Sequence, residues 1–222
     1  MDATNQKRLS WPWLTTVIIG SALFVAALPM GNAWFIFDRS AILQGEVWRM
    51  FTGHWVHFSM SHLLYDAIAL GIAGFILEQK SRWRFGIFCA VAPWIISAAL
   101  LVLEPELKFY AGLSGLATGA VMLVCLEGIR DASWKWIAIG GMIAVTAKTV
   151  FVTGSGVNFG APGIEISQAS HVVGALVAIG LQVETFALRT FPGAYQDRNA
   201  RRSAASATPL NSPGARAKIG RD

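Results

Sequence analysis

The sequence predicts an all-α membrane protein with six transmembrane helices in one domain. Hydrophobic residues make up 54% of the 222 residues and charged residues only 14%, whereas soluble globular proteins carry about 25% charged residues. The few charges are also grouped, so that long stretches between them contain none. This distribution excludes an ordinary soluble globule and favours helices that cross a bilayer.

Six apolar stretches have the length of a transmembrane helix, which needs about 17–25 mostly apolar residues. Four of them contain no Asp, Glu, Lys or Arg, and the other two contain one charge each, Asp66 and Lys148. In chain order, the expected spans are residues 9–37, 55–77, 85–103, 109–126, 136–152 and 166–183. They predict a membrane domain over residues 11–188, preceded by a short cytoplasmic segment, residues 1–10.

The first span also has the hydrophobicity of a signal peptide. It is longer than the apolar region of such a peptide, which has about 7–15 residues, and no A-x-A-like cleavage site comes before the following loop. We therefore expect the first span to be retained as a helix.

The basic residues predict the orientation of the chain in the membrane. With the N-terminus in the cytoplasm, 14 of the 18 Lys and Arg residues lie on the cytoplasmic side, and the positive-inside rule then favours a cytoplasmic location for both termini. Topology therefore accounts for the net charge of +5 without a nucleic acid partner. Residues 189–222, rich in Arg, Ala, Ser, Pro and Gly, are expected to form a disordered basic tail in the cytoplasm.

In this orientation, three spans begin on the outer side with polar residues near their starts. The second span carries His62 and Asp66, the fourth carries Ser114, and the sixth carries His171. Ser114 and His171 each lie five residues past the start of their spans, which corresponds to roughly 8 Å along a helix. Because polar side chains are costly in lipid, this grouping predicts a functional site just below the outer surface.

Small residues at four-residue spacing run beside both Ser114 and His171. Such stripes let two helices pack closely in lipid. They are Ala111, Gly115 and Gly119 in the fourth span, and Ser170, Gly174 and Ala178 in the sixth. If the stripes face each other, Ser114 and His171 come within reach; ordinary helix packing without chemistry is the alternative.

Ser114 and His171 have the chemistry of a catalytic dyad. A serine hydroxyl becomes a nucleophile when a base accepts its proton, and histidine is the usual base. His62 and Asp66 share one helical face because they are four residues apart, and that face could donate hydrogen bonds to a developing oxyanion. The backbone N–H of Ser114 is a further donor if it lies at a helix start. His57 is expected on the turn that leads into the second span.

The motifs around these residues resemble those of rhomboid intramembrane serine proteases. Residues 57–66 (HFSMSHLLYD) resemble H-x4-H-x3-N, residues 112–115 (GLSG) resemble G-x-S-G, and residues 170–174 (SHVVG) resemble A-H-x-x-G. The resemblance covers about residues 40–185 and keeps the family's order of motifs. A single G-x-S-G would be weak evidence, whereas the ordered set is specific.

The resemblance implies a serine endopeptidase of the rhomboid type in a six-helix bundle, with no metal or organic cofactor. Ser114 and His171 would form the dyad. The oxyanion hole would be made by the side chains of His62 and Asp66 and the backbone of Leu113 and Ser114. His57, Gly112, Gly115 and Gly174 would support the motifs. The implied substrates are single-pass membrane proteins, cleaved in or next to their transmembrane anchor.

Some features resemble the bacterial rhombosortase branch of this family. They are Trp48 followed by Thr52-Gly53-His54, the compact six-span body, and Ala147-Lys148 in the fifth span; Trp48-Arg49 also resembles the W-R of the first loop of rhomboids in general. The finer resemblance implies substrates with Gly-Gly C-terminal anchors and a bacterial inner membrane. In the orientation that the basic residues predict, both termini lie in the cytoplasm and the active site faces the periplasm.

Three positions depart from the family pattern. Asp66 stands where the family usually has Asn; an ionised carboxylate there would repel an oxyanion, whereas a neutral acid can donate a hydrogen bond. Thr118 stands where relatives often carry Tyr or His, and Ala178 replaces the second glycine of a G-x-x-x-G. These departures keep open a catalytically impaired rhomboid-like protein that binds membrane clients without cutting them.

The sequence offers weaker support for two other functional classes. A small transporter would line a pathway with polar groups near the midplane, but the halves show no inverted repeat. Three histidines and Asp66 could bind zinc, but no H-E-x-x-H is present and Ser114 would be unexplained. His54 is expected to be an anchor at the membrane interface, outside the site.

Overall fold

The computed structural model of the protein describes residues 10–29, 31–155 and 167–190. Most of the predicted N-terminal segment, and the predicted tail beyond residue 190, lie outside the described residues. Contacts divide the chain into two units, Met1–Gln182 and Val183–Asp222. All residues of the predicted site belong to the first unit.

The first predicted span is helical over only part of its length. Helix α1 (Trp13–Ala27) ends before Pro29, and its C-cap residue, Leu28, has an extended backbone with φ −75° and ψ 131°. Proline pushes the preceding residue out of helical conformation, which explains the early end. The chain continues through short elements: α2 (Gly31–Phe35), β1 (Phe37–Asp38), α3 (Arg39–Leu43), α4 (Arg49–Thr52) and the 3-10 helix η1 (Gly53–Trp55).

The second and third predicted spans lie in one long element, α5 (Met60–Leu103). Its backbone is non-helical at Ser81, with φ −161° and ψ 91°, and this residue separates the two parts. The helix begins at Met60 rather than at residue 55, because η1 comes first and the Ser59 side chain accepts a hydrogen bond from the His62 N–H as an N-cap. His57 therefore lies before the helix, as predicted.

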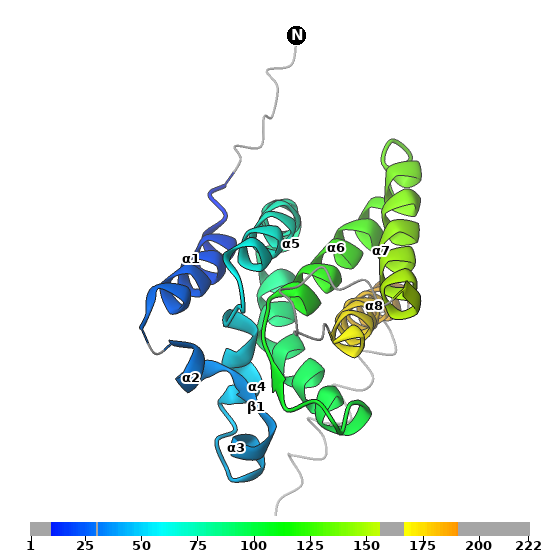
Figure 1. Cartoon of the computed structure of the whole chain (residues 1–222). Coiled ribbons are helices and arrows are strands. Elements are labelled where there is room, and N and C mark those ends of the chain that lie inside the picture. Colours follow the sequence, from blue (N-terminus) through cyan, green and yellow to red (C-terminus); the bar gives the residue numbers. More distant parts are fainter. Residues whose placement is uncertain (1–9, 30, 156–166, 191–222) are drawn as a thin grey trace, which may run out of the picture. The chain divides into compact units, whose positions relative to one another are not determined.

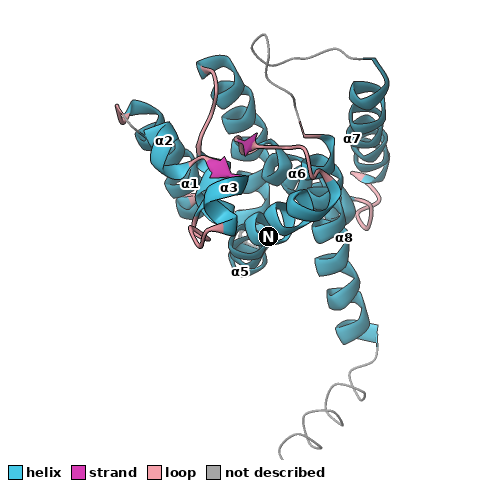
Figure 2. Cartoon of the chain, turned by 60° about the horizontal axis from the view of Figure 1, so that its bottom comes forward, coloured by secondary structure: helices cyan, strands magenta, loops and turns pink. Residues whose placement is uncertain are grey.

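The fourth predicted span begins differently from the prediction. Residues 109–110 form strand β2 (Phe109–Tyr110), which pairs antiparallel with β1 in the register Phe37↔Tyr110 and Asp38↔Phe109. Figure 2 shows these two strands in magenta. Helix α6 (Ser114–Gly128) starts only afterwards. Ser114 is thus the first residue of its helix, not a residue one turn inside it.

The last two predicted spans correspond to helices α7 (Lys135–Ser155) and α8 (Gln168–Thr190). His171 is the fourth residue of α8, whereas Ser114 is the first residue of α6, so the prediction that each lies roughly 8 Å inside its helix was wrong. Apart from the two-residue strands, the described elements are helical, which agrees with the all-α prediction.

Among the described helices, α5 is long and apolar enough to cross a membrane by length and composition. Three shorter apolar helices are Trp13–Ala27, Ser114–Gly128 and Gln168–Val183. The number of six spans stays a prediction.

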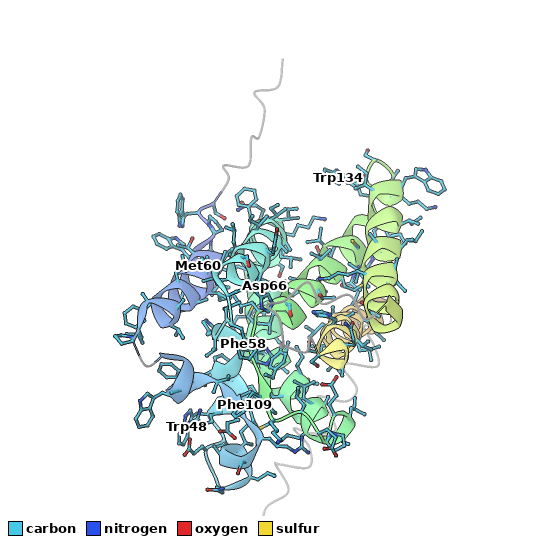
Figure 3. All side chains as sticks on the ribbon, in the orientation of Figure 1. Trp48, Phe58, Met60, Asp66, Phe109 and Trp134 are labelled. Carbon is cyan, nitrogen blue, oxygen red and sulfur yellow. The ribbon has the colours of Figure 1, made fainter. Side chains whose placement is uncertain are left out.

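Helix α5 packs against both α1 and α6, and α6 packs against α7 (Figure 1). The core along these contacts is apolar and includes the fully buried side chains of Leu63, Phe85, Phe88, Ile96 and Leu116. Figure 3 shows Asp66 among the helices, whereas Trp48 and Trp134 extend outward. The helices that carry the polar site residues are therefore held in place by close apolar packing.

Charged side chains connect the helices near the break in α5. The Glu78 carboxylate accepts hydrogen bonds from the N–H groups of Leu14 (3.2 Å) and Thr15 (2.8 Å) and from the Thr15 hydroxyl (2.7 Å), and thereby caps the start of α1. Arg84 donates to Glu127 of α6 at 2.5 Å and also to Gln182 of α8. We call Glu78, Arg84 and Glu127 the inner cluster.

Candidate active site

The segment before Ser114 is held in a conformation that only glycine adopts readily. Gly112 has φ +125°, in the left-handed region that L-residues avoid. A Cβ placed on Gly112 would lie 2.8 Å from Cε1 of His62 and 3.4 Å from Oδ2 of Asp66. Gly112 therefore allows the loop to turn and lets the backbone approach the His62 and Asp66 side chains directly.

Tyr110 fixes the same loop from the strand side. Its hydroxyl donates to the Gly112 carbonyl at 3.1 Å, and it also interacts with the side chains of Ser114 and Ser170. Tyr110 thus connects β2 with the first residue of α6 and the beginning of α8.

His57, Asp66 and Leu113 form one hydrogen-bonded group, and the His62 ring lies in contact with it. Asp66 Oδ2 lies 3.2 Å from His57 Nε2 and 3.3 Å from His62 Nε2. The Leu113 N–H donates to His57 Nε2 at 3.3 Å, and His57 Nδ1 lies 3.3 Å from the Trp55 carbonyl. The structure therefore brings together the side chains predicted for the oxyanion side and ties them to the residue before Ser114.

The small-residue stripes of α6 and α8 meet, as the sequence predicts. A Cβ on Gly115 would lie 3.0 Å from the Ser170 carbonyl oxygen, and one on Gly174 would lie only 2.1 Å from the Gly115 carbonyl oxygen. A Cβ on Gly119 would lie 2.5 Å from the Gly174 carbonyl oxygen. Backbones this close tolerate no side chain, and the contact places the neighbours of Ser114 and His171 against each other.

His171 is buried without a hydrogen-bond partner. Its exposed fraction is 3%, and neither ring nitrogen has a partner among the described residues. Ser114 is also buried, with 8% exposed, and in this part of the chain no hydrogen bond joins its hydroxyl to His171. Buried polar groups in native proteins are nearly always paired, so each unpaired one calls for an explanation, such as a catalytic role.

Comparison with known families agrees with this geometry. The rhomboid domain family matches residues 44–187, which contain every residue of the predicted site. The chain belongs to the rhomboid family. Rhomboid proteins are integral membrane proteins, which agrees with the long apolar helix and with the composition of this chain.

Several relatives carry the name rhomboid protease GlpG. The protein of Salmonella typhi is 27% identical over 172 residues, which cover 76% of this chain and 59% of the relative. Those of Salmonella newport (strain SL254) and Salmonella paratyphi A (strain ATCC 9150 / SARB42) are 28% and 25% identical over the same shares. This chain therefore spans about 59% of the length of these relatives.

The three departures from the rhomboid pattern have clear positions in the structure. Thr118 donates its hydroxyl to the Ser114 carbonyl at 2.8 Å, within α6. Ala178 is fully buried in α8. Asp66 lies between two histidine rings, where an Asn of the rhomboid motif would offer one donor and one acceptor.

The prediction that His54 anchors at the membrane interface was wrong. Its ring is fully buried, and Nε2 lies 3.1 Å from the Pro93 carbonyl and 3.2 Å from the Ser97 hydroxyl. Burial lowers the pKa of His54 from 6.5 to about 4. His54 lies edge-on to the Tyr110 ring at a centroid distance of 5.2 Å. It therefore links η1 to α5 next to the rhomboid serine loop.

Sequence reasoning missed Tyr110 and gave Arg49 no role beyond the W-R resemblance. Arg49 is 7% exposed and donates to the carbonyls of Ala33 (2.9 Å) and Ile36 (3.0 Å). The signal available in the sequence was the charge itself, because an arginine among short apolar elements needs carbonyl or carboxylate partners when buried.

For the zinc alternative, the described ranges contain no group of three or more His, Cys, Asp or Glu side chains placed to hold a metal ion.

Proposed function

We propose that this protein is an intramembrane serine protease that hydrolyses a peptide bond in or next to the transmembrane anchor of membrane-bound substrates. The observation that carries the proposal is His171, a buried imidazole whose two nitrogens have no partner among the described residues, on a helix that packs against the neighbour of Ser114. A free imidazole nitrogen beside a serine is what a general base requires. Catalytic hydrogen bonds often tighten only in the substrate complex, so the open pair is compatible with this role.

In the proposed reaction, Ser114 Oγ attacks the carbonyl carbon of the substrate while His171 accepts the hydroxyl proton. The tetrahedral intermediate collapses, the C–N bond breaks, and His171 returns the proton to the leaving amine. Water then adds to the acyl group on Ser114, with His171 again as base, and releases the carboxylic acid product. The dyad supplies the proton transfers without a cofactor.

Charge develops on the carbonyl oxygen, and we place the oxyanion hole at the start of α6. The Ser114 N–H belongs to the first residue of that helix, where amides have no intrahelical acceptor and the helix dipole favours negative charge. His62 is the proposed side-chain donor. The Leu113 N–H donates to His57 in the structure, so its use in the hole requires an exchange of that bond.

Asp66 fits this side of the site as a neutral acid. Because the Leu113 N–H donates to His57 Nε2, that nitrogen carries no proton, and His57 Nδ1–H donates to the Trp55 carbonyl. Nε2 has one lone pair, so the 3.2 Å contact with Asp66 Oδ2 can be a hydrogen bond, shared with the Leu113 N–H, only if the carboxyl holds the proton. Such an acid lies 3.3 Å from His62 Nε2, leaves the N–H of a neutral His62 free for the oxyanion, and places no negative charge beside it.

The finer proposals concern substrate and membrane. Single-pass membrane proteins with Gly-Gly C-terminal anchors are the proposed substrates, on the resemblance to the rhombosortase branch. The membrane is the proposed bacterial inner membrane, with the site toward the periplasm and both termini in the cytoplasm. Reporter fusions at the two termini test the orientation; a periplasmic signal from either would contradict it.

The direct test is cleavage of a co-expressed Gly-Gly-anchored protein by the wild type and by Ser114→Ala. We expect the substitution to abolish cleavage and labelling by a fluorophosphonate probe, because the nucleophile is lost. Ser61→Ala, at an exposed serine near the start of α5, is the control and should leave both unchanged. Cleavage of other anchored substrates but not of this one would remove the rhombosortase proposal alone.

One observation favours a second candidate, a rhomboid-like protein that binds membrane clients without cutting them. In the part of the chain that the structure describes, no hydrogen bond joins the Ser114 hydroxyl to His171. Two of the three departures from the rhomboid pattern, Asp66 and Thr118, lie in or next to the site. A folded wild type that the fluorophosphonate probe fails to label would support this candidate over the protease.

A further inference from the structure

The N-terminus of α8 is capped by a side chain from the far end of α5. The Ala169 N–H donates to Glu104 Oε1 at 3.3 Å, and the Ser167 hydroxyl donates to the same oxygen at 3.1 Å. Ser167 Oγ in turn accepts the Ser170 N–H at 3.2 Å. Amides at a helix start have no intrahelical acceptor, and a carboxylate there also faces the positive end of the helix dipole. Glu104 thus completes the first turn of α8.

Glu104 is itself fixed on its backbone side. Its N–H donates to the Leu100 carbonyl at 3.1 Å as α5 ends, and its carbonyl accepts from the Leu107 N–H at 3.0 Å. Arg39 of α3 donates to the Glu104 carbonyl at 3.3 Å and to the Leu101 carbonyl at 2.6 Å. The carboxylate that caps α8 is therefore held by an end of α5 that Arg39 anchors.

This cap lies directly before the proposed catalytic base. Ala169 and Ser170 precede His171, and the Ser170 side chain is fully buried, with its hydroxyl donating to the Ser167 carbonyl at 2.7 Å. The ring nitrogens of His171 have no partner among the described residues. Because no hydrogen bond holds the ring within the described structure, its position depends on the surrounding packing and on the backbone of the first turn of α8.

We propose that Glu104 is a positioning residue for His171, acting through Ser167 and the Ala169 amide on the first turn of α8. The inference rests on the proposed protease function. It assigns no chemical step to Glu104, which contacts the helix start and not the reacting atoms. A displacement of about 1 Å at a catalytic group can cost about 100-fold in rate, so loss of this cap should lower turnover without removing the nucleophile.

The test uses the full-length protein in lipid vesicles and compares Glu104→Ala, Glu104→Gln and Glu106→Ala. Glu106 is exposed and two residues away, and it has no ion pair or side-chain hydrogen bond among the described residues, so its variant is the matched control. We expect Glu104→Ala to lower kcat about tenfold or more with KM within about twofold. Glu104→Gln keeps an acceptor oxygen, and kcat should recover to within about threefold of wild type.

Two further measurements test the link between Glu104 and α8 independently of the activity of Glu104→Ala. Ser167→Ala removes the hydroxyl that joins Glu104 to the Ser170 N–H but leaves the Ala169 N–H bonded to Glu104. It should therefore lower kcat in the same direction, and it tests the link if Glu104→Ala fails to fold. Hydrogen exchange at Ala169 and Ser170 should speed up in Glu104→Ala and stay unchanged in Glu106→Ala. A Glu104→Ala protein with wild-type kcat and fluorophosphonate labelling would overturn the proposal, as would a Ser167→Ala protein with wild-type kcat.

A failure of the protease function is distinguishable from a failure of this inference. A wild type that neither cleaves nor reacts with the probe would remove the proposed function. The hydrogen-exchange comparison would still test whether Glu104 stabilises the first turn of α8. Unchanged exchange at Ala169 in Glu104→Ala would show that it does not.

Discussion

Ionisable side chains are buried in two regions of the bundle, and their hydrogen-bond partners differ between the two. In the inner cluster, the Glu78 carboxylate accepts three hydrogen bonds from α1, and Arg84 pairs with Glu127 at 2.5 Å. At the predicted site, Asp66 lies 3.2 Å from His57 Nε2 and 3.3 Å from His62 Nε2, while both nitrogens of His171 have no partner in the described structure. Paired buried groups hold helices together. An unpaired buried group loses its hydration on folding and gains no hydrogen bond in exchange, so its presence indicates a function.

The largest expected effect comes from removing the unpaired ring. His171→Leu fills a similar volume without polar atoms, so we expect cleavage to fall about 1,000-fold or more. Stability should stay the same or rise, because an unsatisfied buried polar group is replaced by an apolar one. The cleavage rate in vesicles and thermal unfolding in detergent measure the two effects. A variant that unfolds as easily as a Glu78 variant would show that His171 is structural.

The inner cluster should behave in the opposite way. Glu78→Gln cannot accept all three hydrogen bonds from α1, and we expect it to lower the free energy of unfolding by about 2–3 kcal/mol. The folded fraction should keep wild-type kcat, because Glu78 lies at the other end of the α5 segment that carries His62. Arg82→Gln is the matched control, since Arg82 is half-exposed at 3.4 Å from Glu78, and it should cost at most about 1 kcal/mol. A loss of kcat in folded Glu78→Gln would show that the inner cluster also affects catalysis, which contradicts the proposed difference between the two regions.

The difference between these regions also explains what the sequence could predict. The motif residues and the small-residue stripes follow from local spacing, and the contact of Gly174 with Gly115 was predictable because only glycine permits such an approach. The group formed by His62 and Asp66 followed from their four-residue spacing. These features depend on residues that are close in the chain or on one steric requirement.

Other features depend on partners far away in the chain. The start of α6 at Ser114 is set by Gly112 at positive φ and by the pairing of Tyr110 with Phe37. The caps made by Glu78 and Glu104 join residues more than sixty positions apart. Helical periodicity carries no information about such pairs. The burial of His54 was missed for the same reason, because its partner is the Pro93 carbonyl in the middle of α5.

His54 offers a smaller test, because it is a buried histidine whose Nε2 has partners in the Pro93 carbonyl and the Ser97 hydroxyl. Its pKa is lowered to about 4 in the folded protein, from 6.5. The unfolded chain therefore binds more protons between these values, so the stabilising contribution is complete above pH 6.5 and is lost as the pH falls toward 4. The slope is at most about 1.4 kcal/mol per pH unit.

Thermal unfolding in detergent between neutral and acid pH measures this contribution. His54→Gln lacks the titrating group, so its stability should decline less than that of the wild type as the pH is lowered. Parallel curves for the two proteins would show that His54 does not titrate across the unfolding transition.

The smallest expected effect concerns Asp66, the one carboxyl of the site that lies against two histidine rings. An Asn amide has N–H donors and an acceptor oxygen, so Asp66→Asn can donate to His57 as a neutral acid does and can keep a polar contact with His62. We expect cleavage within about threefold of wild type, because the site loses no charge that the oxyanion needs. Asp66→Leu, which can make neither bond, is the comparison and should lose most activity. In infrared difference spectra, the wild type should show the carbonyl band of a protonated carboxyl that is absent from Asp66→Asn. If Asp66→Asn instead lost as much activity as Ser114→Ala, the carboxyl would be required in its ionised form, and the pairing of His57 with the Leu113 amide would not describe the working site.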